Sequence, residues 1–208
     1  CVILRGYGRA SKGLQIVSLE GKILVDVKTS GDEAMLLAGS LPKATIIVCE
    51  DRIKAILKAK ELGCKIIFLD DGFSKYKIAK FNILIRPKDE PTNIFCLPSG
   101  GYREPKGFYA QADMELLEEK DFKRVINIKK DGKICELPSK ILLVTAISKP
   151  KRLLDYLPKK IKMVSFSDHY TFTKEDISKI QNEYKEFSIV TTGKDFVKLK
   201  EFNIKNLY

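Results

Sequence analysis

In this 208-residue sequence, Asp70 and Asp71 are adjacent acids whose type and position could do chemistry. They follow the apolar run Ile66–Leu69 directly, and Gly72 comes next. A run of this kind without alternation predicts a strand buried on both faces, as in a parallel sheet. Open α/β folds bind ligands at the carboxyl edge of the sheet, and phosphoryl-transfer proteins hold Mg²⁺ with an acid there. Taken alone, the Asp-Gly pair also fits an ordinary turn.

Asp32 and Glu33 form a second acidic position, at the start of a predicted helix over 34–41. Ser30, three residues before Glu33, completes a capping-box pattern that places Asp32 in the first turn. The helix dipole alone also favours two acids there. The functional interpretation is that one of them faces the site and takes a proton.

His169 is the only histidine, and it follows Asp168 just after a strand predicted over 162–166. A lone histidine usually has no chemical role. Here, however, it lies where the active site of an α/β protein is found, as the two other acidic loops do. The three loops together therefore predict one site at the carboxyl edge of the sheet.

The elements that must position these loops alternate between strands and helices, which predicts an α/β fold with a parallel sheet. Strands are predicted over 2–4, 44–49, 65–69, 82–85, 141–144, 162–166 and 187–190. Helices are predicted over 34–41, 51–62 and 151–157 and after Thr173, which forms a capping box with Asp176. Hairpins are predicted over 14–27 and 121–136, the second linking to another lobe. We expect a core over 1–120, and a hairpin linker with a smaller C-terminal α/β lobe over 121–208.

The formal net charge of +11 indicates an anionic partner, such as nucleic acid, an anionic membrane surface or a phosphorylated ligand. The lysines are scattered without interleaved aromatic residues, so we expect no nucleic acid. Five cysteines without a C-x-x-C pair, together with one histidine, argue against a zinc site and fit a reducing cytoplasm. No apolar run is long enough to span a bilayer. Because the first residue is Cys1, we expect the chain to come from a longer protein.

Six short motifs, in this order along nearly the whole chain, resemble those of the tetraacyldisaccharide 4'-kinases of lipid A biosynthesis. None is specific alone, whereas the ordered set is. They are Arg5-Gly6-Tyr7-Gly8, Gly31-Asp32-Glu33, Asp70-Asp71-Gly72-Phe73, Leu97-Pro98-Ser99-Gly100 with Arg103-Glu104, Asp168-His169, and Thr192 with Lys194-Asp195.

The resemblance implies a P-loop-kinase-like core that transfers a phosphoryl group from ATP, with Mg²⁺, to the 4'-hydroxyl of a lipid A disaccharide precursor. It also implies contact with an anionic membrane surface, at the cytoplasmic face of the bacterial inner membrane. Asp32 would be the general base, oriented and made more basic by His169. The other implied residues are Asp71, Asp70 and Glu33 for the metal, Glu33 and Arg5 for the nucleotide, and Arg103, Glu104 and Lys75 for the substrate.

The sequence departs from the family pattern in several places. Ala34 replaces a proline, Ser74-Lys75 replaces Gln-His, and Gly193 replaces a glutamate. The sequence also contains no G-x-x-x-x-G-K-[ST] P-loop, which in the family lies upstream of the Arg5-Gly6-Tyr7-Gly8 loop together with a membrane-associating segment. We therefore expect this chain alone to bind ATP poorly and to turn over little. The alternative is a non-catalytic protein that has lost the P-loop and binds an anionic lipid or phosphosugar.

Overall fold

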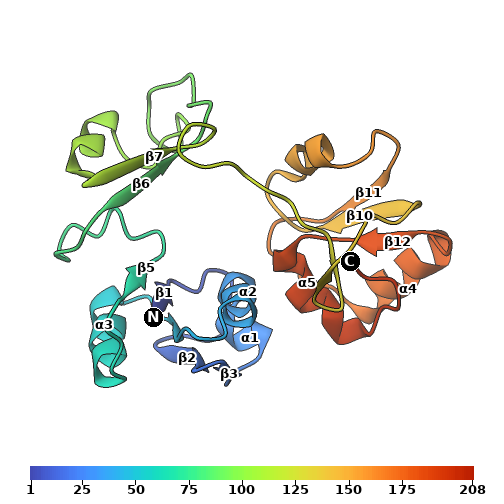
Figure 1. Ribbon diagram of the computed structural model, residues 1–208, viewed down its shortest axis with the longest axis horizontal. Helices are drawn as coiled ribbons and strands as arrows, with labels where there is room; N and C mark the ends of the chain where they lie inside the picture. Colours follow the sequence, from blue (N-terminus) through green and yellow to red (C-terminus); the bar gives the residue numbers. More distant parts are fainter. The chain divides into compact units, whose positions relative to one another are not determined.

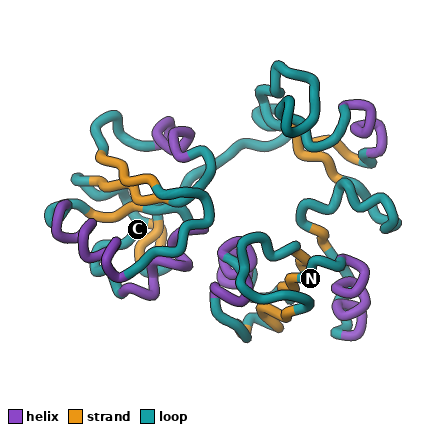
Figure 2. The backbone as a smooth tube through the Cα atoms, turned by 180° about the vertical axis from the view of Figure 1, so that it is seen from behind, coloured by secondary structure: helices purple, strands orange, loops and turns teal.

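The computed structural model describes residues 1–208 and divides into two compact units (Figures 1 and 2). One unit combines Cys1–Phe68 with Ile126–Tyr208, and the other is Leu69–Val125. This division differs from the predicted boundary after residue 120. The physical reason is that helix α2 (Asp32–Ser40) packs against helix α5 (Gly193–Leu199), which joins the two ends of the chain in one unit.

The N-terminal part of the first unit is built on a five-stranded sheet in the order β3-β2-β4-β1-β5. The strands are β1 (Val2–Leu4), β2 (Gln15–Leu19), β3 (Lys22–Ile23), β4 (Ile46–Val48) and β5 (Phe68–Leu69). β1 and β4 are parallel, with Ile3 opposite Ile47, and both of these side chains are fully buried. β2 runs antiparallel to β3 and β4, so the predicted hairpin is present, but it is shorter than expected.

The predicted strand over 65–69 is only partly correct, because β5 has two residues and lies at the edge of the sheet. Ile66 is 66% exposed and Phe68 is 58% exposed, so this strand is not buried on both faces. The apolar run predicts a strand but not its place in the strand order. The buried centre of this sheet is formed by β1 and β4 instead.

The helices of this part begin at different kinds of cap. α3 (Arg52–Glu61) begins as predicted, with the Asp51 side chain accepting from the amides of Ile53 and Lys54. The predicted Ser30–Glu33 capping box is wrong, because Ser30 ends the short helix α1 (Val27–Ser30) and its hydroxyl donates to the carbonyl of Asp26.

The residue that caps α2 is Gly31, with φ of 83°. An added Cβ there would lie 3.2 Å from the carbonyl oxygen of Tyr7. The positive φ and this close approach both favour glycine.

The C-terminal part of the first unit contains a parallel sheet in the order β11-β10-β12. Its strands are β10 (Ile141–Thr145), β11 (Lys162–Ser165) and β12 (Ser188–Val190), which confirms the three predicted strands. β10 is buried along its whole length. Its core side chains pack with α4 (Lys174–Glu183), which begins at the predicted Thr173–Asp176 capping box. The remaining helical segments here are α5 and the 3₁₀ helices η2 (Pro150–Tyr156) and η3 (Lys200–Phe202).

Strands β8 (Lys129–Lys130) and β9 (Lys133–Ile134) form an antiparallel hairpin around Asp131-Gly132. Asp131 and Gly132 both have positive φ, as a tight turn of this kind requires. The predicted hairpin is therefore present, and its role as a linker between lobes stays a prediction.

The second unit pairs two parallel strands, β6 (Ile83–Arg86) and β7 (Met114–Leu117), and carries the 3₁₀ helix η1 (Lys106–Gln111). Its polar centre is Glu90, which accepts hydrogen bonds from Arg86 and the Tyr102 hydroxyl and forms an ion pair with Lys106 at 2.7 Å. Lys106 first and Arg86 second lower the pKa of Glu90 to about 2. This cluster holds the proline- and glycine-rich loop over 91–105 in place.

Candidate active site

Asp32 and His169 lie together in the first unit, although they are 137 residues apart in the sequence. Nδ1 of His169 lies 3.2 Å from Oδ2 of Asp32. Asp32 is the first residue of α2 and only 5% exposed, and its Oδ1 accepts from the amide of Glu33. His169 has a φ of 59°, and its amide donates to the carbonyl of Ala146 just past β10. The two predicted catalytic residues are thus in contact.

Two lysines of α5 complete the surroundings of this dyad, and the sequence reasoning did not select them. Lys194 Nζ lies 3.1 Å from Nε2 of His169 and 3.3 Å from Oε1 of Glu33. Lys198 Nζ lies 3.5 Å from Oδ2 of Asp32. Residues four apart on a helix share a face, so both ammonium groups point the same way. The Thr192, Lys194-Asp195 motif was the signal available for finding them.

Asp195 fixes the start of α5 against the end of β10. This carboxylate is fully buried, and its Oδ2 accepts from the Thr145 hydroxyl and the Ala146 amide, each at 3.0 Å. The Thr192 hydroxyl lies 2.9 Å from the same oxygen, and Lys198 Nζ lies 3.0 Å from Oδ1. Asp195 therefore positions the helix that carries both lysines.

Gly193, where the family pattern has a glutamate, lies at the contact between α5 and α2. A Cβ at this position would lie 3.1 Å from Cδ1 of Leu36. Close packing of the two helices therefore favours glycine here.

The loop that follows β1 and contains Tyr7 and Gly8 packs against the His169 ring. The Tyr7 ring centroid lies 5.0 Å from that of His169, and a Cβ added to Gly8 would lie 3.3 Å from Nδ1. Arg9, whose side chain is 2% exposed, holds the loop through Glu50 at 2.7 Å and the carbonyl of Gly13 at 2.6 Å.

The two arginines of this loop therefore differ in role. Hydrogen bonds from its own backbone amide and from Arg9 lower the pKa of Glu50, so the Arg9–Glu50 contact is a structural ion pair. Arg5, the residue predicted to bind the nucleotide, is exposed at the end of β1.

The remaining predicted residues belong to the second unit. Asp71 has a φ of 50°, and its Oδ2 lies 2.9 Å from Nη1 of Arg103, in a solvent-exposed ion pair. Burial first and the hydrogen bond with Glu104 second raise the pKa of Tyr76. Lys75 is exposed beside them. The structure thus brings Asp71 and Arg103 together, and places Glu104 against Tyr76.

The predicted metal ligands are of the right chemical type, because carboxylate oxygens are the donors that Mg²⁺ prefers. Glu33 belongs to the first unit and Asp70 and Asp71 to the second. In the structure Glu33 contacts Lys194 and Asp71 contacts Arg103, and no group of three or more His, Cys, Asp or Glu side chains is arranged to hold a metal. The Mg²⁺ site stays a prediction.

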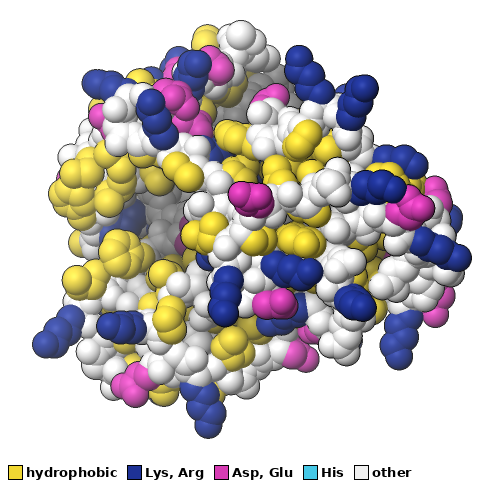
Figure 3. All heavy atoms as spheres, turned by 45° about the vertical axis from the view of Figure 1, so that its right-hand side comes forward, with side chains coloured by type: hydrophobic (Ala, Val, Ile, Leu, Met, Phe, Trp, Pro, Cys, Tyr) yellow, Lys and Arg dark blue, Asp and Glu magenta, His cyan; other side chains and the backbone are white.

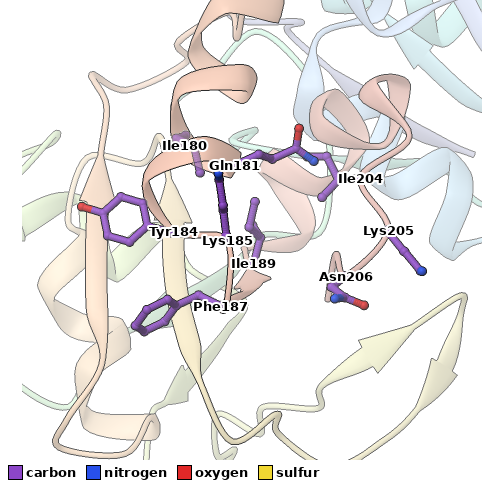
Figure 4. Close-up of a pocket in the computed structure, with 9 residues that line it drawn as sticks. All are labelled: Ile180, Gln181, Tyr184, Lys185, Phe187, Ile189, Ile204, Lys205 and Asn206. Atoms are coloured by element: carbon purple, nitrogen blue, oxygen red, sulfur yellow. The ribbon is translucent and has the colours of Figure 1, made fainter.

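A hollow beside α4 is separate from these predicted residues. A cavity of about 220 Å³ lies between α4, β12 and the C-terminal segment, and none of the predicted residues lines it (Figure 4). Its walls combine apolar side chains, including Ile180, Phe187 and Ile189, with the polar side chains of Lys185 and Lys205. It is lined by no carboxylate and no imidazole, so the predicted acid–histidine pair is not part of it.

The chain is similar in sequence to one family of known proteins along its whole length. The family model described as tetraacyldisaccharide-1-P 4'-kinase matches residues 1–208. A tetraacyldisaccharide 4'-kinase of Aliarcobacter butzleri is 75% identical over 208 residues, which are 100% of this chain and 66% of that protein. One from Helicobacter pylori is 46% identical over 204 residues, 98% of this chain and 63% of that protein. The chain thus spans slightly less than two thirds of the length of these relatives.

A solved structure also matches. It is the crystal structure of LpxK from Aquifex aeolicus in complex with ATP, with a TM-score of 0.72 and 27% identity, covering 100% of this chain and 71% of that one. Its likeness confirms a mixed α/β fold with parallel strands. With the whole-chain family match, the chain belongs to the tetraacyldisaccharide-1-P 4'-kinase family.

Proposed function

We propose that this chain serves the ATP-dependent phosphorylation of the 4'-hydroxyl of a tetraacyldisaccharide 1-phosphate in lipid A biosynthesis. The observation that carries the proposal is the buried Asp32 carboxylate held by the only histidine of the chain. Phosphoryl transfer is catalysed mainly by positioning and charge stabilisation, so a base needs correct placement more than unusual strength. The family match and the names of the relatives favour the kinase over the non-catalytic alternative.

Asp32 would accept the proton of the sugar hydroxyl as the hydroxyl oxygen attacks the γ-phosphorus of ATP. The bond from that phosphorus to the β,γ-bridging oxygen would break, and ADP would leave. His169 would hold the carboxylate in one orientation through Nδ1. Glu33 and Arg5 would contribute to the nucleotide site, and the ATP in the LpxK crystal structure supports ATP as the donor. The likeness also supports a P-loop-kinase-like core.

Mg²⁺ bound by Glu33, Asp70 and Asp71 would offset the negative charge of the transferring phosphoryl group. Glu33 would then give up its ion pair with Lys194, and Asp71 its ion pair with Arg103, in order to bind the metal. Arg103, Glu104 and Lys75 would bind the disaccharide phosphate or its sugar hydroxyls.

The acceptor carries acyl chains, so the enzyme must work at a membrane surface, and we propose the cytoplasmic face of the bacterial inner membrane. The net charge of +11 favours approach to anionic lipid headgroups. Figure 3 shows Lys and Arg side chains spread widely over the visible face, with apolar side chains between them. None of the helices combines the length and the apolar character needed to cross a bilayer.

The test is transfer of labelled phosphate from ATP to the disaccharide acceptor by the full-length protein. Asp32→Asn removes the base while keeping its shape, and we expect turnover to fall about 10²-fold or more. His169→Ala should also lower turnover, and the double variant should be little worse than Asp32→Asn alone, because the two residues act as a unit. Asp131→Asn, in the exposed hairpin turn, is the matched control. Unchanged turnover in folded Asp32→Asn would remove the base assignment.

A further inference from the structure

The imidazole of His169 lies between an acid and a lysine. Nδ1 is 3.2 Å from Oδ2 of Asp32, and Nε2 is 3.1 Å from Nζ of Lys194. Oδ1 of Asp168 is 3.9 Å from Nε2, which is too far for a hydrogen bond. The His169 side chain is 17% exposed, so these protein groups are its main partners.

The chemistry of these partners determines which ring nitrogen carries the proton. A lysine ammonium has three donors and no acceptor. Nε2 must therefore offer its lone pair to Lys194, and in a neutral ring the proton is then on Nδ1. Nδ1–H points at the Asp32 carboxylate, which accepts it. A proton on Nε2 would face the ammonium donor to donor.

We infer that Lys194 is a positioning residue that holds His169 in the neutral Nδ1–H tautomer, so that His169 donates a hydrogen bond to Asp32. The tautomer rests on the geometry alone, and its importance for turnover rests on the proposed function. Because Lys194 occupies Nε2, His169 orients the base and is not itself the acceptor of the substrate proton.

Lys194 is well placed to keep this contact. Its ammonium also lies 3.3 Å from Oε1 of Glu33 and 3.7 Å from Oδ1 of Asp168, and its side chain is 18% exposed. Asp195, the next residue, is anchored at the end of β10, which fixes the backbone from which Lys194 extends.

The tautomer is measurable by ¹⁵N nuclear magnetic resonance of protein labelled on histidine. His169 is the only histidine in the sequence, and a His169→Gln variant assigns its two signals. We expect a pyrrole-like Nδ1 and a pyridine-like Nε2. Lys194→Met should lower the ratio of the Nδ1–H to the Nε2–H tautomer about tenfold or more, equivalent to about 1.4 kcal/mol. Lys194→Arg, which also has only donors, should restore the ratio.

Lys200→Met is the matched control, because Lys200 is exposed at the end of the same helix, and it should leave the signals unchanged. A wild-type ring protonated on Nε2, or on both nitrogens at neutral pH, would overturn the inference, as would a wild-type spectrum in folded Lys194→Met. If Lys194→Met does not fold, the wild-type spectrum still decides. The measurement needs neither ATP nor turnover, so its failure is distinct from failure of the kinase proposal, which Asp32→Asn tests.

Discussion

Replacing the buried Asp195 by alanine is expected to destabilise the first unit strongly. The carboxylate is fully buried and accepts hydrogen bonds from Thr145 and Ala146. Thr192 adds a third. The Lys198 ammonium lies 3.0 Å from Oδ1, close enough for an ion pair but not aligned for a hydrogen bond.

The expected magnitude follows from what alanine leaves behind. Three donors each lose a hydrogen bond to a charged acceptor. One such hydrogen bond contributes about 1.5–3 kcal/mol to stability, and the three contributions do not add fully. Lys198, whose side chain is 12% exposed, also loses the nearer of its two carboxylate partners. Removing one member of a buried ion pair typically costs about 3–5 kcal/mol, so we expect a loss of about 4 kcal/mol. Asp195→Asn keeps one acceptor oxygen and should lose about 2 kcal/mol.

The assay is urea unfolding followed by far-UV circular dichroism, since the chain has no tryptophan to report by fluorescence. A loss of about 4 kcal/mol lowers the midpoint by more than about 1 M urea. Asp131→Asn, at an exposed turn whose positive φ asparagine tolerates, is the control for removing a carboxylate charge. A loss below about 1 kcal/mol in Asp195→Ala would refute the view that this acid anchors α5.

Two further predictions concern the glycine loop and the second unit. Gly8→Ala and Gly13→Ala should each cost about 1 kcal/mol in urea unfolding, since both glycines have positive φ. Only Gly8→Ala should also slow phosphoryl transfer, because its Cβ would lie 3.3 Å from Nδ1 of His169 whereas nothing lies within 4 Å at Gly13; equal effects on transfer would contradict the proposed packing. The lowered pKa of Glu90, about 2 against an ordinary 4.5, means that this carboxylate contributes stability that is fully present above about pH 4.5 and is lost as the pH falls toward 2. Glu90→Gln should flatten the acid limb of the stability curve over that window, and an unchanged limb would show that Glu90 is not paired.

The sequence predicts the buried strands of the sheets better than the edge strand β5. Runs such as Ile141–Val144 predict buried strands because their apolar pattern is local, and β10 confirms it. The run over 65–69 has the same pattern but forms an edge strand, because strand order depends on contacts far apart in the sequence. The capping box predicted at Ser30 was wrong for a related reason. Its spacing from Glu33 is right for a capping box, but a short helix that ends at Ser30 already uses its hydroxyl.

The candidate site shows the same limit. Asp32 and His169 were predicted because each belongs to a motif of the family resemblance, and the structure places them in contact. Lys194 and Lys198 were not selected, because α5 was not predicted and lysines at i and i+4 are common on solvated helix faces. Their role depends on the contact between α5 and α2. Neighbouring residues in the sequence do not predict that contact.

Lys194 and Lys198 should have different measurable effects, because Lys194 contacts His169 and Lys198 contacts Asp32. Lys198 contacts both Asp195 and Asp32, so a change at Asp195 should lower stability and also disturb the Asp32 carboxylate. Lys194 contacts the other end of the His169 ring, so its removal should shift the tautomer with a smaller effect on unfolding. Asp195→Asn should therefore have the larger effect on urea unfolding, and Lys194→Met should have the larger effect on the ¹⁵N signals of His169. The same variant having the larger effect in both measurements would mean that the helix, and not the individual ammonium groups, sets the state of the dyad.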